Sequence, residues 1–247
     1  MRDGRHAALP PALLGALAFW GGILMAGRRY PAEFDWRYMT LSTLLSPRSN
    51  PAGYAWAAGG IGCAGVCLVA WTLTMRRRLG HPSASAPLGL WSLGVGSACM
   101  ALVGFFPQRL AVLPRLHEFL TLLAFAGLCL GSGLLTAQAA EGVLGTRADA
   151  VAPRHRVYRA ALAGVVAVPV FLAGLAQAYV FYVLPELHWV SLAWRQKGIP
   201  LYLSFAFWEW STCALLFAYL GFLSVAWPMA RGGSPTRLGI SAINADQ

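Results

Sequence analysis

The residues that could carry chemistry in this chain are two histidines, three acids and one serine, set at the borders of long apolar stretches. They are Asp35, Ser42, His117, Glu118, Glu186 and His188. Imidazole and carboxylate groups together can bind a metal ion, and a serine with a histidine and an acid can perform nucleophilic catalysis. No HxxxH or HExxH pair stands in the sequence, and helix-end capping or headgroup contact would explain the same residues. We therefore predict no metal and no cofactor.

Glu209 differs from these residues because it stands inside an apolar stretch. If that stretch spans 200–227, Glu209 lies about nine residues along it, or ~14 Å at ~1.5 Å per residue. A charged carboxylate at that depth is costly, so it should face the protein interior, be paired or be protonated. Thr212 and Cys213 share its helix face, and Gln177 is expected at a similar depth. Two interpretations remain open: an acid that carries protons or orients a substrate, and a packed, neutral, hydrogen-bonded side chain.

The elements that must position these residues are six apolar stretches, each about as long as a lipid bilayer is thick, since a span needs about 20 apolar residues. Hydrophobic residues make up 57% of the 247 residues and charged residues 11%, which argues against a soluble globule. The net charge of +10 is scattered over loops without a nucleic-acid motif, so no nucleic-acid partner is predicted. The prediction is an all-α integral membrane protein, a single domain over 1–247 built as a six-transmembrane-helix bundle with short loops. The spans are predicted near 9–27, 52–75, 87–106, 118–140, 158–184 and 200–227, with a flexible tail at 228–247.

The distribution of basic residues predicts the orientation. With six spans both termini lie on one side, and that side carries eleven Lys and Arg residues against eight on the other. The positive-inside rule then places both termini in the cytoplasm, and we predict the bacterial inner membrane as the location. Of the three outer loops, residues 33–45 are expected to form an interfacial helix. Residues 107–117 are expected to be interfacial or re-entrant.

Small residues should let the helices approach closely, because lipid offers no hydrophobic drive for helix association. The second span contains a run of glycine and alanine that includes Gly60, the third contains Gly94 and Gly96, and the fourth contains Gly127 and Gly131. All five cysteines fall in predicted spans, where we expect them to be small packing residues.

Three short motifs resemble those of a known six-helix superfamily. They are Thr40-Leu-Ser42-Thr-Leu-Leu-Ser46-Pro47, the third-span ending Gly104-Phe-Phe-Pro107 with His117 after it, and Phe207-Trp-Glu209-Trp210. The chain resembles the superfamily of the damage-regulated autophagy modulators (DRAM) and the FGF-receptor-activating proteins, which includes uncharacterised bacterial membrane proteins. The best-matched positions are His117 and Glu209, followed by Ser42 and Pro107. The resemblance implies lipid handling in general terms, without a shared reaction.

We accordingly predict that membrane lipids are the partners, with a lipid-like amphiphile bound in an outward-facing polar pocket covered by the first outer loop. Arg109 and Arg115 would contact a phosphate, because guanidinium binds phosphate in a bidentate manner. The predicted ligand-binding residues are Ser42, Arg109, Arg115, His117, Gln177, His188 and Glu209, with Glu118 beside them. The chain could also form a homo-oligomer or join other membrane subunits.

Three alternatives stay open. The first is an intramembrane lipid hydrolase or acyl transferase, with His117 as base and Glu209 or Glu118 as orienting acid or metal ligand. The second is a proton-coupled transporter that uses Glu209, although the sequence lacks the repeat that many transporters show. The third is a structural membrane subunit without a ligand.

Overall fold

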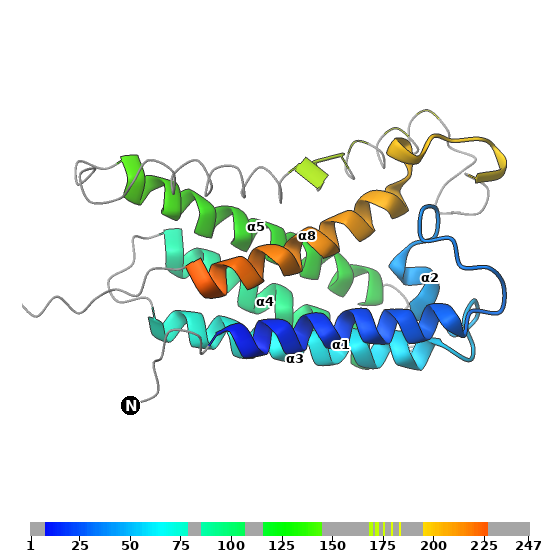
Figure 1. The fold of residues 1–247 in the computed structure, drawn as a ribbon, viewed down its shortest axis with the longest axis horizontal. Helices are drawn as coiled ribbons and strands as arrows, with labels where there is room; N and C mark the ends of the chain where they lie inside the picture. The colour runs from blue at the N-terminus through cyan, green and yellow to red at the C-terminus, as the bar shows by residue number, and fades with distance from the viewer. Residues whose placement is uncertain are drawn as a thin grey trace, which may run out of the picture.

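The computed structural model describes residues 8–78, 85–106, 116–144 and 195–226, together with isolated positions between 168 and 183. Within these residues the elements are all helical (Figure 1). The long helices are α1 (Leu9–Arg28), α3 (Tyr54–Arg78), α4 (Ser85–Phe105), α5 (Leu116–Leu144) and α8 (Phe205–Ala226). Two short helices, α2 (Leu41–Leu45) and the 3-10 helix η4 (Leu201–Leu203), precede α3 and α8.

Each long helix is long and apolar enough to cross a membrane, which confirms the prediction of an all-α membrane bundle. Five of the six predicted spans coincide with these helices, and their ends differ from the predicted ends by a few residues. The predicted span at 158–184 lies mostly outside the described residues, as does the predicted tail at 228–247.

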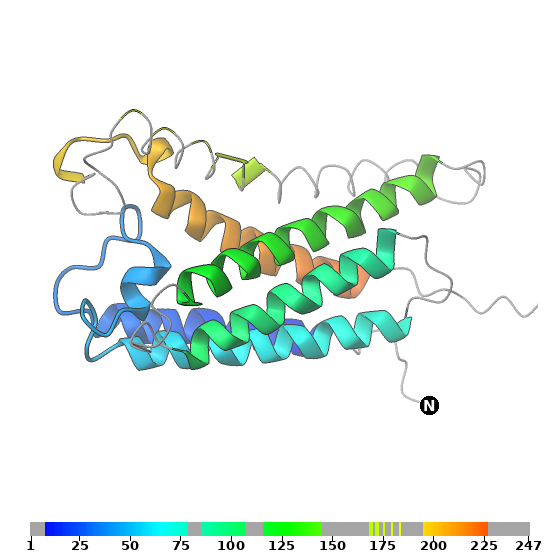
Figure 2. The same cartoon turned by 180° about the vertical axis from the view of Figure 1, so that it is seen from behind.

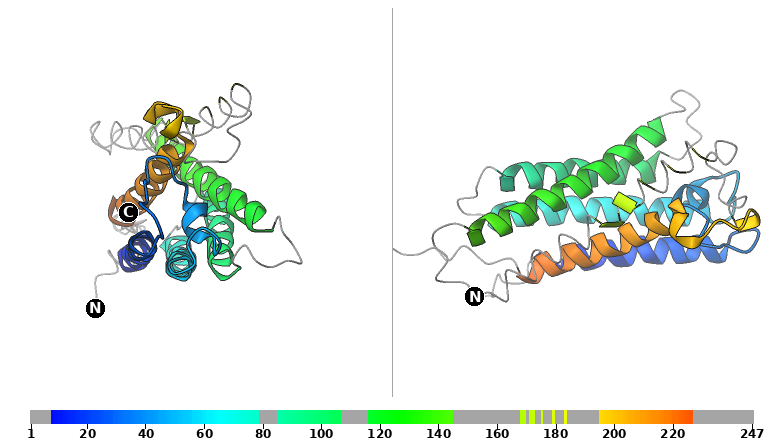
Figure 3. Two further views of the ribbon diagram at one scale, coloured as in Figure 1. Left: turned by 90° about the vertical axis from the view of Figure 1, so that its right-hand side faces the viewer. Right: turned by 90° about the horizontal axis from the view of Figure 1, so that it is seen from above.

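The helices pack side by side in chain order from α1 through α3 and α4 to α5, as the view from behind shows (Figure 2). Helix α8 crosses the bundle obliquely, and the views from the end and from above show it beside α1 and α5 (Figure 3). Helices α5 and α8 run in the same direction, whereas α1, α3, α4 and α5 alternate (Figure 1). The last residue of α5, Leu144, and the first residue of η4, Leu201, therefore lie at opposite ends of the bundle (Figure 1).

Glycines set the close approach of neighbouring helices, as predicted. A Cβ atom on Gly60 of α3 would lie 2.6 Å from the Ala18 carbonyl oxygen of α1. A Cβ atom on Gly96 of α4 would lie 2.7 Å from the Leu128 nitrogen of α5. Any larger residue would push these backbones apart, so small residues are needed where the helices cross.

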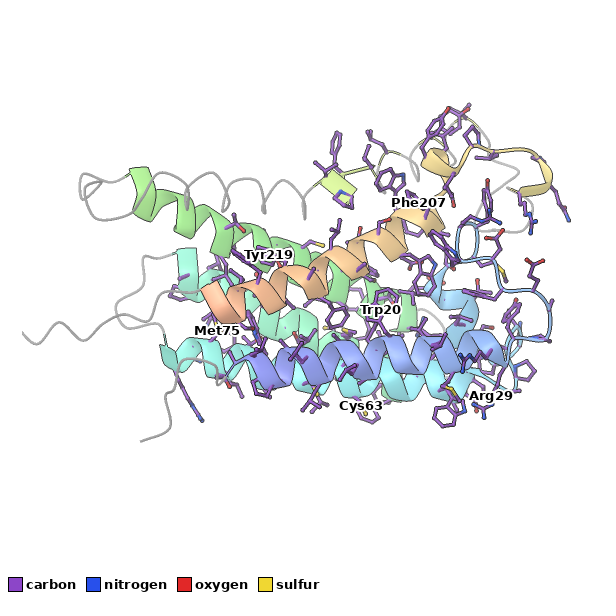
Figure 4. All side chains as sticks on the ribbon, viewed as in Figure 1. Trp20, Arg29, Cys63, Met75, Phe207 and Tyr219 are labelled. Carbon is purple, nitrogen blue, oxygen red and sulfur yellow. The ribbon has the colours of Figure 1, made fainter. Side chains whose placement is uncertain are left out.

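Helix α8 is joined to the bundle by hydrogen bonds at its carboxyl-terminal half. The Tyr219 hydroxyl donates to the Ser132 carbonyl of α5 over 2.9 Å and also bonds the Thr136 hydroxyl. The Trp71 indole of α3 donates to the Ser224 hydroxyl over 2.7 Å. In Figure 4 the Tyr219 side chain points from α8 towards α5. These bonds fix one end of α8 while its other end meets the outer loop.

Candidate functional site

Side chains at the amino-terminal end of α8 form hydrogen bonds with the backbone of the loop between α1 and α3. The Ser204 hydroxyl donates to the Arg37 carbonyl, and the Trp210 indole donates to the Met39 carbonyl over 2.8 Å. The Leu41 amide donates to Oε2 of Glu209 over 2.9 Å. The backbone groups of residues 37, 39 and 41 therefore all face this end of α8, after a turn at residues 36–38.

This arrangement corrects the prediction of an interfacial helix over residues 33–45. The helix is confined to α2, and Thr40 before it is extended, with φ −73° and ψ 163°. The carbonyls of Arg37 and Met39 bond the side chains of Ser204, just before α8, and of Trp210 within it, so they are not part of a helical hydrogen-bond ladder. Helix α2 buries Leu44 and its neighbours in the bundle instead of lying along its surface.

Aromatic side chains cover the same junction. The Trp36 ring lies 6.0 Å from the Phe207 ring, and the Phe34 ring lies 6.0 Å from the Trp210 ring. On the other side of Trp210, the Trp20 ring of α1 is 6.2 Å away. Figure 4 shows Trp20 between α1 and α8, and Phe207 near the loop end of α8. Two sets of aromatic contacts therefore join the loop to α8, and the one centred on Trp210 also reaches α1.

The far end of the loop is fixed by Asn50, which is fully buried. Its side-chain amide donates to the Ala26 carbonyl at the end of α1 and to the Leu44 carbonyl of α2, both over 3.2 Å. Gly53 lies against this side chain, where a Cβ atom would be 2.5 Å from the Asn50 oxygen. Asn50 thus sets the position of α2 relative to α1.

Asp35 organises the charged part of the loop. Its carboxylate accepts hydrogen bonds from the Arg37 guanidinium at 2.8 and 3.0 Å, and Arg195 lies 3.4 Å away. These bonds from Arg37 hold the pKa of Asp35 below its ordinary value, although its burial acts in the opposite direction. Both guanidinium groups are thereby occupied by Asp35, at the end of the bundle where Figure 4 places Arg29.

A cavity of about 60 Å³ lies between the helices beneath α2. Its walls come from α1, α2, α3, α4, α5 and α8, and most of them are apolar. The apolar side chains that line it are Phe19, Leu41, Leu45, Ile61, Met100, Val103, Ala124, Phe125, Leu128, Leu216 and Phe217. The polar ones are Ser42, Thr121, Glu209 and Cys213. The cavity is thus more apolar than the pocket expected from the sequence, because α1, α3 and α4 contribute only apolar side chains.

Glu209 and Ser42 are the predicted site residues that the structure brings to this cavity. Glu209 is 5% exposed, and among the described residues its hydrogen-bond donor is the Leu41 amide. Its predicted distance from the start of its helix was wrong, because α8 begins at Phe205 after the turn of η4. Glu209 is therefore four residues into the helix, or about 6 Å at ~1.5 Å per residue. The carboxylate lies near the loop end of the bundle and not at its middle.

His117 is buried near the start of α5 but is not among the residues that line the cavity. It is 7% exposed, and within the described part of the chain neither imidazole nitrogen has a hydrogen-bond partner. Glu118, the next residue, is exposed. Among the described residues no group of three His, Cys, Asp or Glu side chains could hold a metal ion. The predicted site residues Arg109, Arg115, Gln177 and His188 lie outside the described residues.

Several residues of the site were not predicted from the sequence. Thr121 lines the cavity. It stands four residues after His117, a spacing that places both residues on one helix face, and this spacing could have indicated Thr121 from the sequence. Trp210 belongs to the motif that contains Glu209, but nothing in that motif indicates a bond to Met39. Ser204 and Asn50 bond backbone carbonyls, which every loop residue offers, so the sequence gives no sign of their partners.

These features define the class of the protein: an all-α integral membrane bundle with an internal, largely apolar cavity closed at one end by a loop helix. No family model matches the chain, and neither a curated protein nor a solved structure matches it.

Proposed function

We propose that this protein binds a membrane amphiphile whose hydrocarbon chain occupies the cavity between the helices. The observation that carries the proposal is an apolar cavity inside a membrane bundle with a carboxylate and a hydroxyl among its lining groups. Cavities lined by apolar side chains stay dry and accept hydrocarbon. The volume of about 60 Å³ suits a section of one chain and not a whole two-chain lipid.

The orientation and the resemblance support the same proposal. The charge bias predicts that the termini face the cytoplasm, so the loop end of the cavity would face outward from a bacterial inner membrane. Two of the motifs that resemble the DRAM superfamily fall at this end, in α2 and at the start of α8. We propose that the chain shares with that superfamily a role in lipid handling.

The test is native mass spectrometry of the purified protein with membrane lipid and single-chain amphiphiles, scoring the bound mass. Ala124→Phe places a large ring in the cavity, whereas Ala126→Phe places it on an exposed part of the same helix. We expect wild type and Ala126→Phe to retain the ligand and Ala124→Phe to lose it. Equal retention in the two variants, or no retention by wild type, would contradict the proposal.

A further inference from the structure

We propose that the corner of the bundle where α1 ends and α3 begins binds the phosphate group of an anionic phospholipid. The residues that would hold it are Arg28, Arg29 and Arg48, together with the ring of Trp56. None of them lines the cavity, so this inference does not rest on the proposed function. It also differs from the phosphate contact predicted from the sequence, whose two arginines lie outside the described residues.

The three arginines start from one corner of the bundle because Asn50 joins the loop to α1. The Asn50 side chain donates to the Ala26 carbonyl, two residues before Arg28. Arg28 is the last residue of α1 and Arg29 follows it directly, and Figure 4 shows Arg29 at this end of the helix. Arg48 stands two residues before Asn50, so their Cα atoms are at most about 7.6 Å apart, at ~3.8 Å per residue.

An aromatic ring fixes the position of Arg29. Its guanidinium carbon lies 4.8 Å from the centre of the Trp56 ring, which is within the range of a cation–π contact. Stacking uses the face of the guanidinium group and leaves its in-plane N–H groups free to donate to phosphate oxygens. Trp56 is itself 47% exposed, so part of its ring remains available to a lipid, and indole rings are common at the level of the headgroups.

The charges of this corner are not used by the protein. Within the described ranges the three guanidinium groups form no hydrogen bond or ion pair, and all three side chains are exposed. The described acids of the same loop act on Arg37 instead. The hydrogen bond to Asp35 and, to a smaller extent, the charge of Glu33 raise the pKa of Arg37. An anion can therefore bind at the corner without displacing a described partner.

The carboxyl end of α1 opposes an anion only weakly. It is the negative end of the helix dipole, equivalent to about half an elementary charge, against the three full positive charges of the arginines. Its last carbonyls are also bonded already. The Ala26 carbonyl accepts from the Asn50 side chain and the Arg29 amide, and the Gly27 carbonyl accepts from the Tyr30 amide, each over 3.2 Å. The balance of charge at the corner therefore favours a phosphate.

The experiment titrates the purified protein with phosphatidylglycerol and with phosphatidylcholine of the same acyl chains, and scores bound lipid by native mass spectrometry in an uncharged detergent. We expect phosphatidylglycerol to reach half occupancy at a concentration about tenfold lower. Arg28→Gln and Arg48→Gln should each reduce this preference about fivefold, the ratio for about 1 kcal/mol per cation. Arg195→Gln removes the same charge from the same end of the bundle, but from a residue that pairs with Asp35, and should keep the preference.

The outcomes test the site, its occupant and its independence from the cavity. Equal binding of the two lipids, or an equal loss of preference in Arg195→Gln and Arg48→Gln, would overturn the site. Glycerol phosphate should not bind at the concentrations that saturate with phosphatidylglycerol, and equal binding of the two would overturn a lipid as the occupant. Ala124→Phe, which fills the cavity, should keep the preference for phosphatidylglycerol. If it removed that preference, the phosphate would belong to the ligand of the cavity and the separate site would be refuted.

Discussion

The hydrogen bond from Trp210 to Met39 should control how often the loop opens over the cavity. Trp210→Phe keeps an aromatic ring for contact with Phe34 and Trp20 but removes the indole donor. The Met39 carbonyl then loses a buried partner at 2.8 Å. We expect the segment that carries Leu41 to open more often without unfolding the bundle.

The magnitude follows from the cost of an unsatisfied buried acceptor. That cost is about 1–3 kcal/mol in soluble proteins, and interhelical bonds in a membrane protein reach at most about 1.7 kcal/mol. A cost of about 1–2 kcal/mol raises the opening equilibrium roughly 5- to 30-fold, at 1.4 kcal/mol per factor of ten. The exchange rate of the Leu41 amide hydrogen should rise by the same factor, because this hydrogen is bonded to Glu209 only when the segment is closed.

The assay is amide hydrogen exchange in detergent micelles, resolved to a peptide that covers α2. Trp208→Phe is the matched control, since the Trp208 indole donates to the Tyr202 carbonyl just before its own helix and not to the loop. We expect faster exchange at Leu41 in Trp210→Phe and little change in Trp208→Phe. Equal acceleration in both variants, or none in Trp210→Phe, would refute the role given to this bond.

Two further predictions concern helix packing and pH. Gly22→Ala would place a Cβ atom 2.5 Å from the Trp56 carbonyl oxygen, so it should lower the free energy of unfolding in detergent titrations by about 1–3 kcal/mol. In Gly21→Ala the added Cβ atom meets nothing within 4 Å, so the free energy of unfolding should stay unchanged or rise by up to about 1 kcal/mol. Similar losses of stability in the two variants would contradict a close approach of α1 and α3 at Gly22. Because hydrogen bonds from Arg37 lower the pKa of Asp35, their contribution is present above about pH 4, the ordinary pKa of an aspartate, and is lost as the pH falls through the lowered value. Protection from exchange in residues 35–39, taken relative to the intrinsic exchange rate at each pH, should therefore fall below about pH 4 in wild type. In Asp35→Asn this protection should already be lower at neutral pH; identical pH profiles of protection would show that the pair does not order the loop.

The membrane spans could be predicted from the sequence because the requirement for apolar length acts on each helix by itself. The crossings at Gly60 and Gly96 could be predicted for a related reason, since only small residues allow two backbones so close together. Each of these signals depends only on the residue types within one short stretch of sequence. They predict the helices of the bundle and their close contacts independently of the structure of the loops.

The site could be predicted only in part, because its contacts join distant segments through the backbone. Glu209 was recognisable as an acid in an apolar stretch, but its depth depended on where α8 begins. The turn of η4 before Phe205 moves that start, and hydropathy cannot detect such a turn among apolar residues. The partner of Glu209 is the Leu41 amide, a group that any residue except proline would supply.

The structure also bears on the two interpretations of Glu209. If Glu209 were only structural, both of its carboxyl oxygens would accept hydrogen bonds from the protein. If it were only functional, other residues would fix its position and both oxygens would be left for a ligand. Glu209 combines these arrangements, because Oε2 orders the start of α2 while the residue lines the cavity beside Ser42. The bond to Leu41 orients the carboxylate in advance, so a ligand that donates to it need not order the side chain itself. The same carboxylate thus contacts both the loop and the cavity. A substitution that opens the loop should therefore alter ligand binding in the cavity, and a bound ligand should alter how often the loop opens.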